Sequence, residues 1–309
     1  MTTRSPADPF TDPLSSVVAL LRPQPAISKM VEASGRWLVE RTDLRSPFYA
    51  AIVEGRTRLT IESRAPVMLE AGDFVLIPEV ERFTMTSEAT TTLGAARLPL
   101  ETGPGTYRLG PVEKTVEMRA LIGHCRFAAA EKVLLLSLLP EMVHLSGHER
   151  LLTLVPLIHD ETQSNRPGRA MILERLLEVL MIEALRANSS AGHPPGLSRG
   201  LSDPRLVGPL SLIHNDVGRS LSVEDLAREA GMSRSAFYDR FRRALGVAPK
   251  EYVMGWRMAV ARDLLLRGNL TNAEIAHRVG YGSASAFCMA FVRHQGMAPG
   301  AFAAAHAAG

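Results

Sequence analysis

Arginine and hydroxyl-bearing side chains gather in one short stretch near the C-terminus. Its cations are Arg234, Arg240, Arg242 and Arg243. A guanidinium is permanently charged and carries a planar fork of donors, so these cations suit the phosphate oxygens of a nucleic acid. If the stretch is helical, one face holds Ala236, Phe237 and Phe241. The opposite, outward face then consists of Arg234, Ser235, Tyr238, Asp239 and Arg242.

This stretch belongs to a unit that is written twice. Residues 221–249 read LSVEDLAREAGMSRSAFYDRFRRALGVAP, and residues 270–299 read LTNAEIAHRVGYGSASAFCMAFVRHQGMAP. Each copy predicts a short helix, a turn at Gly231 or Gly280, and a second helix capped by Ser233 or Ser283. Two such units, joined by a helical segment over residues 252–266, predict a tandem pair of helix-turn-helix DNA readers.

Residues 261–302 carry the most specific pattern, ARDLLLRGNLTNAEIAHRVGYGSASAFCMAFVRHQGMAPGAF. The Leu-Leu pair, the I-A-x-x-V-G-[FY] turn, the Ser-rich helix start, F-x-x-x-F and G-x-x-P resemble the second reader of the AraC/XylS family of bacterial transcription regulators. The resemblance implies a seven-helix unit whose readers enter adjacent major grooves, about 34 Å apart. It also implies double-stranded DNA and RNA polymerase as partners, and a role as an activator.

The resemblance assigns roles to individual side chains. Ser235, Tyr238 and Asp239 align with base-contacting positions, and Arg234 aligns with a cationic position near the DNA backbone. The second copy presents Ser283, Ser285, Cys288 and Met289 instead. Many relatives have Arg where Met289 stands and Lys where Val292 stands, so the second reader lacks donors for guanine or phosphate. We expect it to contribute less specificity, whether Met289 faces DNA or packs inward.

The N-terminal half follows another pattern. Short β-branched segments separated by turns predict strands at residues 50–55, 57–63, 67–69, 73–78 and 82–87, typical of an antiparallel barrel or sandwich. Residues 69–78, LEAGDFVLIP, resemble the turn of a cupin barrel, and the layout resembles the cupin-type domain of one branch of the family. We therefore expect an α+β protein, with a cupin-like β-barrel and a helical bundle before the all-α readers. Its parts are a disordered tail (1–12), a sensor domain (13–187), a linker (188–203) and the DNA-binding domain (204–303).

Three helices are expected within the sensor domain, over residues 131–139, 149–158 and a last one from Arg169 to Arg186. The last helix has a wide apolar face. These helices can form a bundle within one subunit. Alternatively, the last helix also pairs with its copy in a second subunit and makes a homodimer.

The predicted barrel lacks the side chains of a metal site. No histidine precedes His124, and Tyr49 and Phe83 occupy positions where relatives often have histidine. We therefore expect no metal, no cofactor and no enzymatic activity, and a cupin enzyme fused to the readers is the weaker alternative. Apolar and aromatic walls suit a small organic effector, with Tyr49 and Phe83 as candidate contacts. In the other interpretation the barrel is packed solid.

Composition agrees with a regulator that acts in the cytoplasm. Only Cys125 and Cys288 are present, so a disulfide framework is excluded. Cys125, beside His124, offers an alternative function as a thiol redox sensor, although a structural cysteine at a domain seam explains it as well. Residues 204–309 hold 13 of the 35 Lys and Arg but only 8 of the 32 Asp and Glu, so the positive charge lies with the readers. No apolar run is long enough to cross a membrane.

Overall fold

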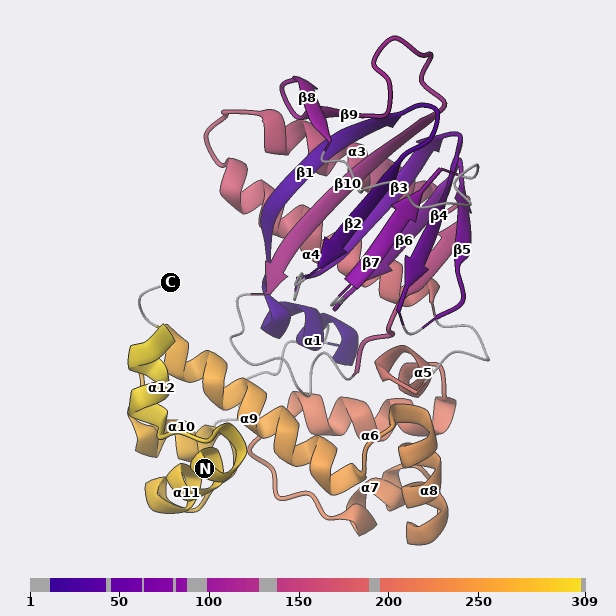
Figure 1. Ribbon diagram of the computed structural model, residues 1–309. Coiled ribbons are helices and arrows are strands. Elements are labelled where there is room, and N and C mark those ends of the chain that lie inside the picture. Colours follow the sequence, from indigo (N-terminus) through magenta and orange to yellow (C-terminus); the bar gives the residue numbers. More distant parts are fainter. Residues whose placement is uncertain are drawn as a thin grey trace. The chain divides into compact units, whose positions relative to one another are not determined.

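The computed structural model describes residues 12–42, 46–62, 64–79, 82–87, 99–127, 138–188 and 195–306. Its contacts divide the chain into two compact units (Figure 1). The N-terminal unit consists of the described parts of 22–128 and 140–188, and the C-terminal unit of those in 1–21, 129–139 and 189–309. Residues 1–11 of the expected tail and residues 131–137 of the first expected bundle helix (131–139) lie outside the described residues.

The N-terminal unit contains two sheets. Its strands are β1 (Pro23–Ala33), β2 (Leu38–Thr42), β3 (Phe48–Glu54), β4 (Arg56–Ile61), β5 (Val67–Glu70), β6 (Asp73–Ile77), β7 (Arg82–Thr86), β8 (Leu100–Gly103), β9 (Thr106–Leu109), β10 (Met118–Phe127) and β11 (Val143–Ser146). One sheet has the order β11-β6-β3-β10-β1-β9-β8 and the other β2-β7-β4-β5. The pairs are antiparallel except for β1 with β9.

The five expected strands are therefore present, but the expected closed barrel is not. Among the described residues no strand pair joins the two sheets, and each sheet ends in short strands. Three of the four edge strands, β5, β8 and β11, have only four residues. Short edge strands leave only a few unpaired backbone N–H and C=O groups, and water can bind these groups. The sheets therefore do not need to close into a barrel to satisfy them.

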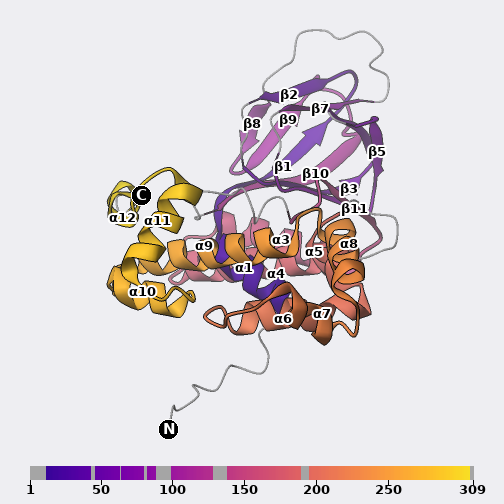
Figure 2. The same cartoon turned by 90° about the horizontal axis from the view of Figure 1, so that it is seen from below.

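Alternating apolar residues fill the space between the two sheets. In β4, for example, Thr57, Leu59 and Ile61 are buried while their neighbours are more exposed. Strands β3, β6 and β10 are buried almost throughout. The reason is that α3 (Glu149–Gln163) and α4 (Arg169–Ala187) contact the other face of the larger sheet. Figure 2 shows the resulting layers, two of sheet and one of helices.

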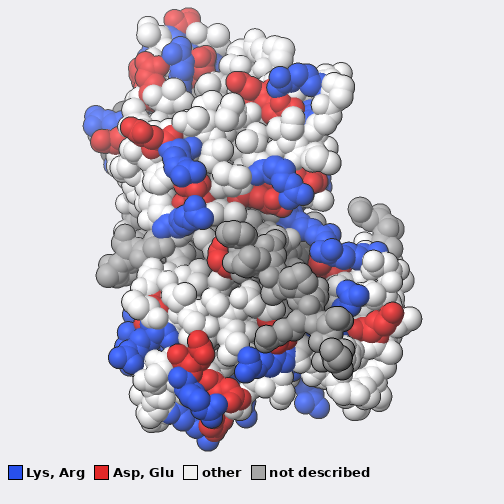
Figure 3. All heavy atoms as spheres, turned by 180° about the vertical axis from the view of Figure 1, so that it is seen from behind, with Lys and Arg blue, Asp and Glu red and all other residues white. Residues whose placement is uncertain are grey.

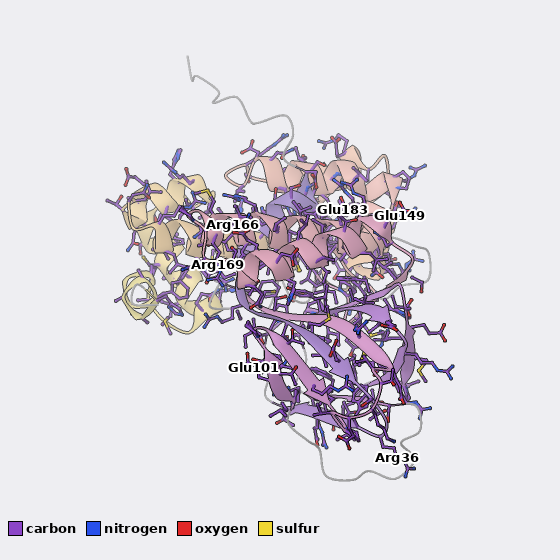
Figure 4. All side chains as sticks on the ribbon, turned by 90° about the horizontal axis from the view of Figure 1, so that it is seen from above. Arg36, Glu101, Glu149, Arg166, Arg169 and Glu183 are labelled. Carbon is purple, nitrogen blue, oxygen red and sulfur yellow. The ribbon has the colours of Figure 1, made fainter. Side chains whose placement is uncertain are left out.

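Helices α3 and α4 form an antiparallel hairpin with buried charges at each end. Near the connection, the carboxylate of Glu161 is buried and pairs with Arg166 at 2.5 Å. At the other end Glu183 is buried and pairs with Arg150 and Arg186, each at 3.3 Å. Figure 4 shows Arg166 and Arg169 together at the connection, with Glu149 and Glu183 at the opposite end. Buried carboxylates need such partners, and of these pairs Arg150–Glu183 is the one that links α3 to α4.

The expected tight turn before β6 is present. Gly72 has φ of +90°, and the Asp73 carboxylate accepts the Glu70 N–H at 2.9 Å. His144 lies in strand β11, and its Nε2 is 3.0 Å from Asp73 Oδ2. Burial opposes the charged form of Asp73. The hydrogen bonds from Glu70, Ser146 and His144 outweigh that effect and lower the pKa of Asp73.

The C-terminal unit is helical. Its helices are α1 (Pro13–Leu21), α5 (Leu197–Leu201), α6 (Pro204–Asn215), α7 (Val223–Glu229), α8 (Arg234–Leu245), α9 (Pro249–Arg267), α10 (Asn272–Arg278), α11 (Ala284–Gln295) and α12 (Pro299–His306). The sequence placed residues 13–21 with the sensor, but α1 contacts α5, α6 and α9. Leu14, Val17, Val18 and Leu21 are buried. An apolar helix packs wherever a complementary apolar surface lies, and sequence position alone does not reveal that surface.

The expected linker also differs at its C-terminal end. Leu197 in α5 is buried, and a Cβ on Gly200 would lie 2.6 Å from Leu245 Cδ2. Asp203 caps α6 by accepting the Arg205 N–H. Residues 195–203 are therefore ordered and packed rather than a flexible linker. The buried side chain of Leu197 and the lack of a side chain at Gly200 allow this short helix to pack against α8. Residues 189–194 lie outside the described part of the chain.

Candidate nucleic-acid interface

Both readers begin with the same cap and the same turn. Ser222 with Asp225, and Thr271 with Glu274, form reciprocal capping boxes at the starts of α7 and α10. Gly231 and Gly280 then adopt positive φ of +61° and +81°, as expected from the sequence. These turns direct the chain into the second helix of each unit.

The second helices are positioned by serine caps and a phenylalanine core. Ser233 Oγ accepts the Ala236 N–H at 3.3 Å, and Ser283 Oγ accepts the Ala286 N–H at 3.1 Å. The inward-facing aromatic residues are fully buried: Phe237, Phe241, Phe287 and Phe291. Ala236 is exposed, contrary to the sequence-based expectation. It lies in the first turn, one position before the buried stripe begins.

The outward face of α8 consists of the residues expected there. Ser235, Tyr238, Asp239 and Arg242 are all exposed, and Tyr238 retains 39% of its surface. Arg234 forms an ion pair with Glu224 of α7 at 2.9 Å, and its side chain remains 67% exposed. An exposed pair of this kind costs little to break, so Arg234 can exchange Glu224 for a phosphate. Figure 3 shows Lys and Arg gathered toward the lower end of the C-terminal unit, interspersed with Asp and Glu.

Arg240 has a different role from the one its charge suggested. Its Nε and Nη2 donate to both carboxylate oxygens of Asp203, at 2.6 and 3.0 Å. Burial opposes the charged form of Asp203, but Arg240 and the Arg205 N–H outweigh it and lower the pKa of Asp203. A bidentate pair holds both groups firmly. Arg240 therefore fastens α8 to the start of α6, and it is not a free cation for phosphate.

Helix α11 presents a different surface at the corresponding positions. Met289 and Val292 retain 64% and 43% of their surface, and Ser285 is also exposed. The alternative in which Met289 packs inward is therefore wrong. Cys288 is only half-exposed and packs against the core of this half of the unit. Of the four residues predicted on this reader, Cys288 is thus the one turned furthest inward, with Ser283 used as the cap.

A buried polar cluster lies in the C-terminal unit, between α6 and α9. His214 Nε2 is 2.7 Å from the Tyr252 hydroxyl, and the ring stacks on Trp256 at 3.8 Å between centroids. Burial lowers the pKa of His214 to about 3, despite an opposing effect of Asp12. The imidazole is therefore neutral at physiological pH. The sequence pattern gave no sign of this cluster, because His214 occupies an ordinary helical position.

Comparison with known proteins agrees with this geometry. A cupin family model matches residues 12–189, and a helix-turn-helix domain model matches residues 226–305. An AraC-like transcription regulator from Streptomyces lividans is 33% identical over 303 residues, covering 94% of this chain and 97% of the relative. The chain belongs to the AraC family of transcription regulators. An AraC-like regulator from Streptomyces antibioticus is 31% identical with the same coverage of both chains.

Two solved structures also match parts of the chain. The DNA-binding domain of AdpA, solved with a target DNA, is 34% identical over 35% of this chain and 96% of its own, with a TM-score of 0.32. ToxT from Vibrio cholerae, solved with an unsaturated fatty acid, is 12% identical over 90% of this chain and 93% of its own, with a TM-score of 0.36. The AraC-type assignment rests on the family models and the Streptomyces relatives. None of the described helices is long and apolar enough to cross a membrane.

The N-terminal unit of this AraC-type regulator contains a small cavity between its sheets. Its volume is about 30 Å³, and its wall includes Trp37, Phe48 and Phe83. The predicted contact Phe83 therefore lines the cavity. Tyr49 does not line it, because successive strand residues face opposite sides and Phe48 takes the inner side. A cavity of this size holds about one water molecule, so most of the space between the sheets is filled.

Charged and titratable groups also line the cavity, and sequence reasoning missed them. Lys29, Arg41 and His124 contribute to its wall. Burial lowers the pKa of Lys29, and the nearby Arg41 lowers it further. Burial, Lys29 and Arg41 together lower the pKa of His124 to about 4. Strand alternation could have predicted the position of His124, because it is two residues from inward-facing Ile122 and lies on the same face of the strand.

A larger hollow, of about 620 Å³, lies on the same unit. Its wall includes Gly55, Arg56, Glu70 and Glu117, and it shares Trp37 and Met118 with the small cavity. Trp37 therefore contributes to the walls of both spaces.

Cys125 is a buried thiol, and no metal cluster is evident in the described residues. Cys125 retains only 1% of its surface. Burial raises the pKa of the Tyr49 hydroxyl, and the nearby Cys125 raises it further. Buried thiols react slowly compared with exposed ones, which opposes the alternative of a redox sensor. Within the described ranges no three His, Cys, Asp or Glu side chains gather in a way that suits a metal ion.

Proposed function

We propose that this AraC-type regulator binds a specific operator through α8 and α11 and controls transcription in response to a small organic effector held by its N-terminal unit. The observation that supports the DNA-binding part is the repeated reader: the same cap, positive-φ turn and phenylalanine core occur twice, each time leaving one helix face exposed. In α8 that face carries the polar groups that read base edges.

Selection of bound sites from random DNA by the full-length protein tests this proposal. We expect one enriched motif, bound at least a hundredfold more tightly than shuffled DNA of equal length. Transcription with purified RNA polymerase from a promoter carrying that motif then gives the sign of regulation, for which activation is the expected result. Enrichment of no motif would contradict the proposal.

The effector is proposed to be a small apolar molecule with an acidic group. The supporting observation is the cavity wall, which combines apolar and aromatic residues with Lys29 and Arg41 and, among the described residues, includes no carboxylate. An anion would relieve the repulsion between these two cations. Because the cavity holds about 30 Å³, such a ligand has to push the sheets apart, and that movement supplies a signal.

Thermal unfolding with a panel of short fatty acids and aromatic carboxylates tests the effector. A ligand at a hundred times its Kd stabilises the folded unit by about 2.7 kcal/mol, a rise in Tm of roughly 5–10 °C for a unit of this size. Lys29→Met and Arg41→Met should abolish the rise, while Arg126→Met, an exposed cation on β10, should keep it. An equal rise with the corresponding alcohols would contradict the acidic group.

Self-association through α4 is a further part of the proposal. Ile172 and Val179 are exposed, and with half-buried Leu176 they form an apolar row at helical spacing. The Arg175–Glu178 ion pair flanks this row, so a copy related by a two-fold axis can exchange ion pairs across the contact. These features favour a second copy of the chain as the partner.

Sedimentation analysis tests the homodimer. Ile172→Glu should place a charge in the contact and weaken dimerisation at least tenfold, because an unpaired buried charge is costly. Thr153→Glu, which introduces the same charge at an exposed position of α3, should leave the association unchanged. A monomeric wild-type protein at micromolar concentration would refute this part while leaving the DNA-binding proposal intact.

A further inference from the structure

We propose that the second reader recognises thymine through its methyl group, with Met289 and Val292 of α11 contacting the C5-methyl groups of one or two thymines in the major groove. The inference rests on the proposed DNA-binding function and specifies which base the second half of the site must contain. It follows from the position, exposure and chemistry of these two side chains.

The repeat places Met289 and Val292 on the DNA-facing side of the helix. Helices α8 and α11 each have twelve residues, begin after a capping serine and end at a positive-φ glycine. The offset of 50 that relates Phe237 to Phe287 also relates Asp239 to Met289 and Arg242 to Val292. These two residues thus occupy the positions at which the first reader presents a carboxylate and a guanidinium.

Their exposure agrees with this placement. Met289 and Val292 retain 64% and 43% of their surface, whereas Phe287 and Phe291 on the same helix retain none. Residues three apart on a helix are neighbours, so Met289 and Val292 form one continuous apolar surface. Arg293 follows beside them and is also exposed, at the position equivalent to Arg243 of the first reader. The face therefore retains one cation for the DNA backbone next to an apolar patch.

The chemistry of the major groove then limits the partner. A methionine thioether and a valine methyl offer no useful hydrogen bond to a base edge, and the one apolar group in the major groove is the thymine C5-methyl. Any base pair would lose water from its polar edge atoms there, but only thymine also offers a methyl group that gains from burial against these side chains. The two side chains lie about 5–6 Å apart, which spans one or two base-pair steps of about 3.4 Å.

Replacement of single thymines by deoxyuridine tests the inference, because uracil lacks only the methyl group. In the selected operator, each substitution should be measured by fluorescence anisotropy with the full-length protein. We expect a threefold to fivefold loss of affinity at one or two thymines of one half-site, as for a buried methyl group. Replacing such a thymine by cytosine should weaken binding further, and 5-methylcytosine should recover part of the loss.

Variants assign the effect to the helix. Met289→Ala should abolish the difference between thymine and uracil at one position, while Tyr238→Ala on the first reader should leave that difference unchanged. Equal affinity for thymine and uracil throughout a tightly bound operator would overturn this inference alone. Normal discrimination in Met289→Ala together with lost activation by RNA polymerase would show that the face contacts the polymerase instead. Failure to select any operator would overturn the proposed function and this inference together.

Discussion

Replacement of Gly280 by alanine should disable the second reader through its turn. Gly280 has φ of +81°, a conformation that costs an L-residue about 1–2 kcal/mol. A Cβ there would also lie 2.8 Å from the Gly218 carbonyl oxygen and from Arg257 Nη2, closer than normal contact. Displacing this backbone should add about 1–3 kcal/mol, as for other overpacked sites. The total is roughly 2–5 kcal/mol.

Two other glycines provide matched controls. Gly231 has φ of +61°, but its nearest neighbour to a new Cβ, Arg205 Nη1, lies 3.7 Å away. Gly231→Ala should therefore cost only the conformational part, about 1–2 kcal/mol. Gly282 has neither a positive φ nor an atom within 4 Å, so Gly282→Ala should be neutral or slightly stabilising.

Urea unfolding of the full chain measures these differences. Trp256 lies in α9 and Trp37 in the N-terminal unit, so the fluorescence of Trp256 in a Trp37→Phe background reports unfolding of the C-terminal unit. Affinity for the selected operator should fall in the same order as stability. If Gly280→Ala and Gly282→Ala unfold at the same urea concentration, the assignment of the turn is refuted.

Three further outcomes follow from the C-terminal unit. Tyr238→Ala should reduce discrimination between operators by about 1–3 kcal/mol, and Met289→Ala should reduce it by less; the reverse order in binding assays would contradict the ranking of the readers. The pKa of His214 is lowered to about 3 in the folded unit, so the unfolded chain takes up the proton first as pH falls below 6.5. Stability should therefore fall by about 1.4 kcal/mol per pH unit from 6.5 toward 3, and His214→Leu should flatten this dependence in urea titrations. Arg234→Ala should lower the salt dependence of DNA binding by about one unit, whereas Arg240→Ala should destabilise the unit and leave the salt slope unchanged.

The sequence predicted the readers well because their signals are local. A capping serine, a positive-φ glycine and a pair of phenylalanines at helical spacing each specify structure within a few residues, and all three appear twice. The outward face of α8 follows directly from them. The pairing of Arg240 with Asp203 could not be predicted in this way, because the partners are 37 residues apart and meet only after α6 and α8 have packed.

The N-terminal unit was predicted less completely for the same physical reason. Strand positions follow from alternation and turns, but whether the edges close depends on long-range pairing that no local pattern encodes. Phe83 lines the cavity and Tyr49 does not, because the face on which each side chain lies follows from the alternation along its strand; whether either contacts an effector stays a prediction. The attachment of α1 to the C-terminal unit depends on surfaces far apart in the chain.

The salt dependence of operator binding tests the central claim most directly. Binding of the full-length protein to a labelled duplex carrying one selected site should be measured by fluorescence anisotropy across a range of potassium chloride concentrations. Two readers that make about five to nine phosphate contacts predict a log–log slope of roughly −4 to −8. A slope near zero, or equal affinity for the selected site and a shuffled duplex, would contradict the account of this chain as a sequence-specific DNA-binding regulator.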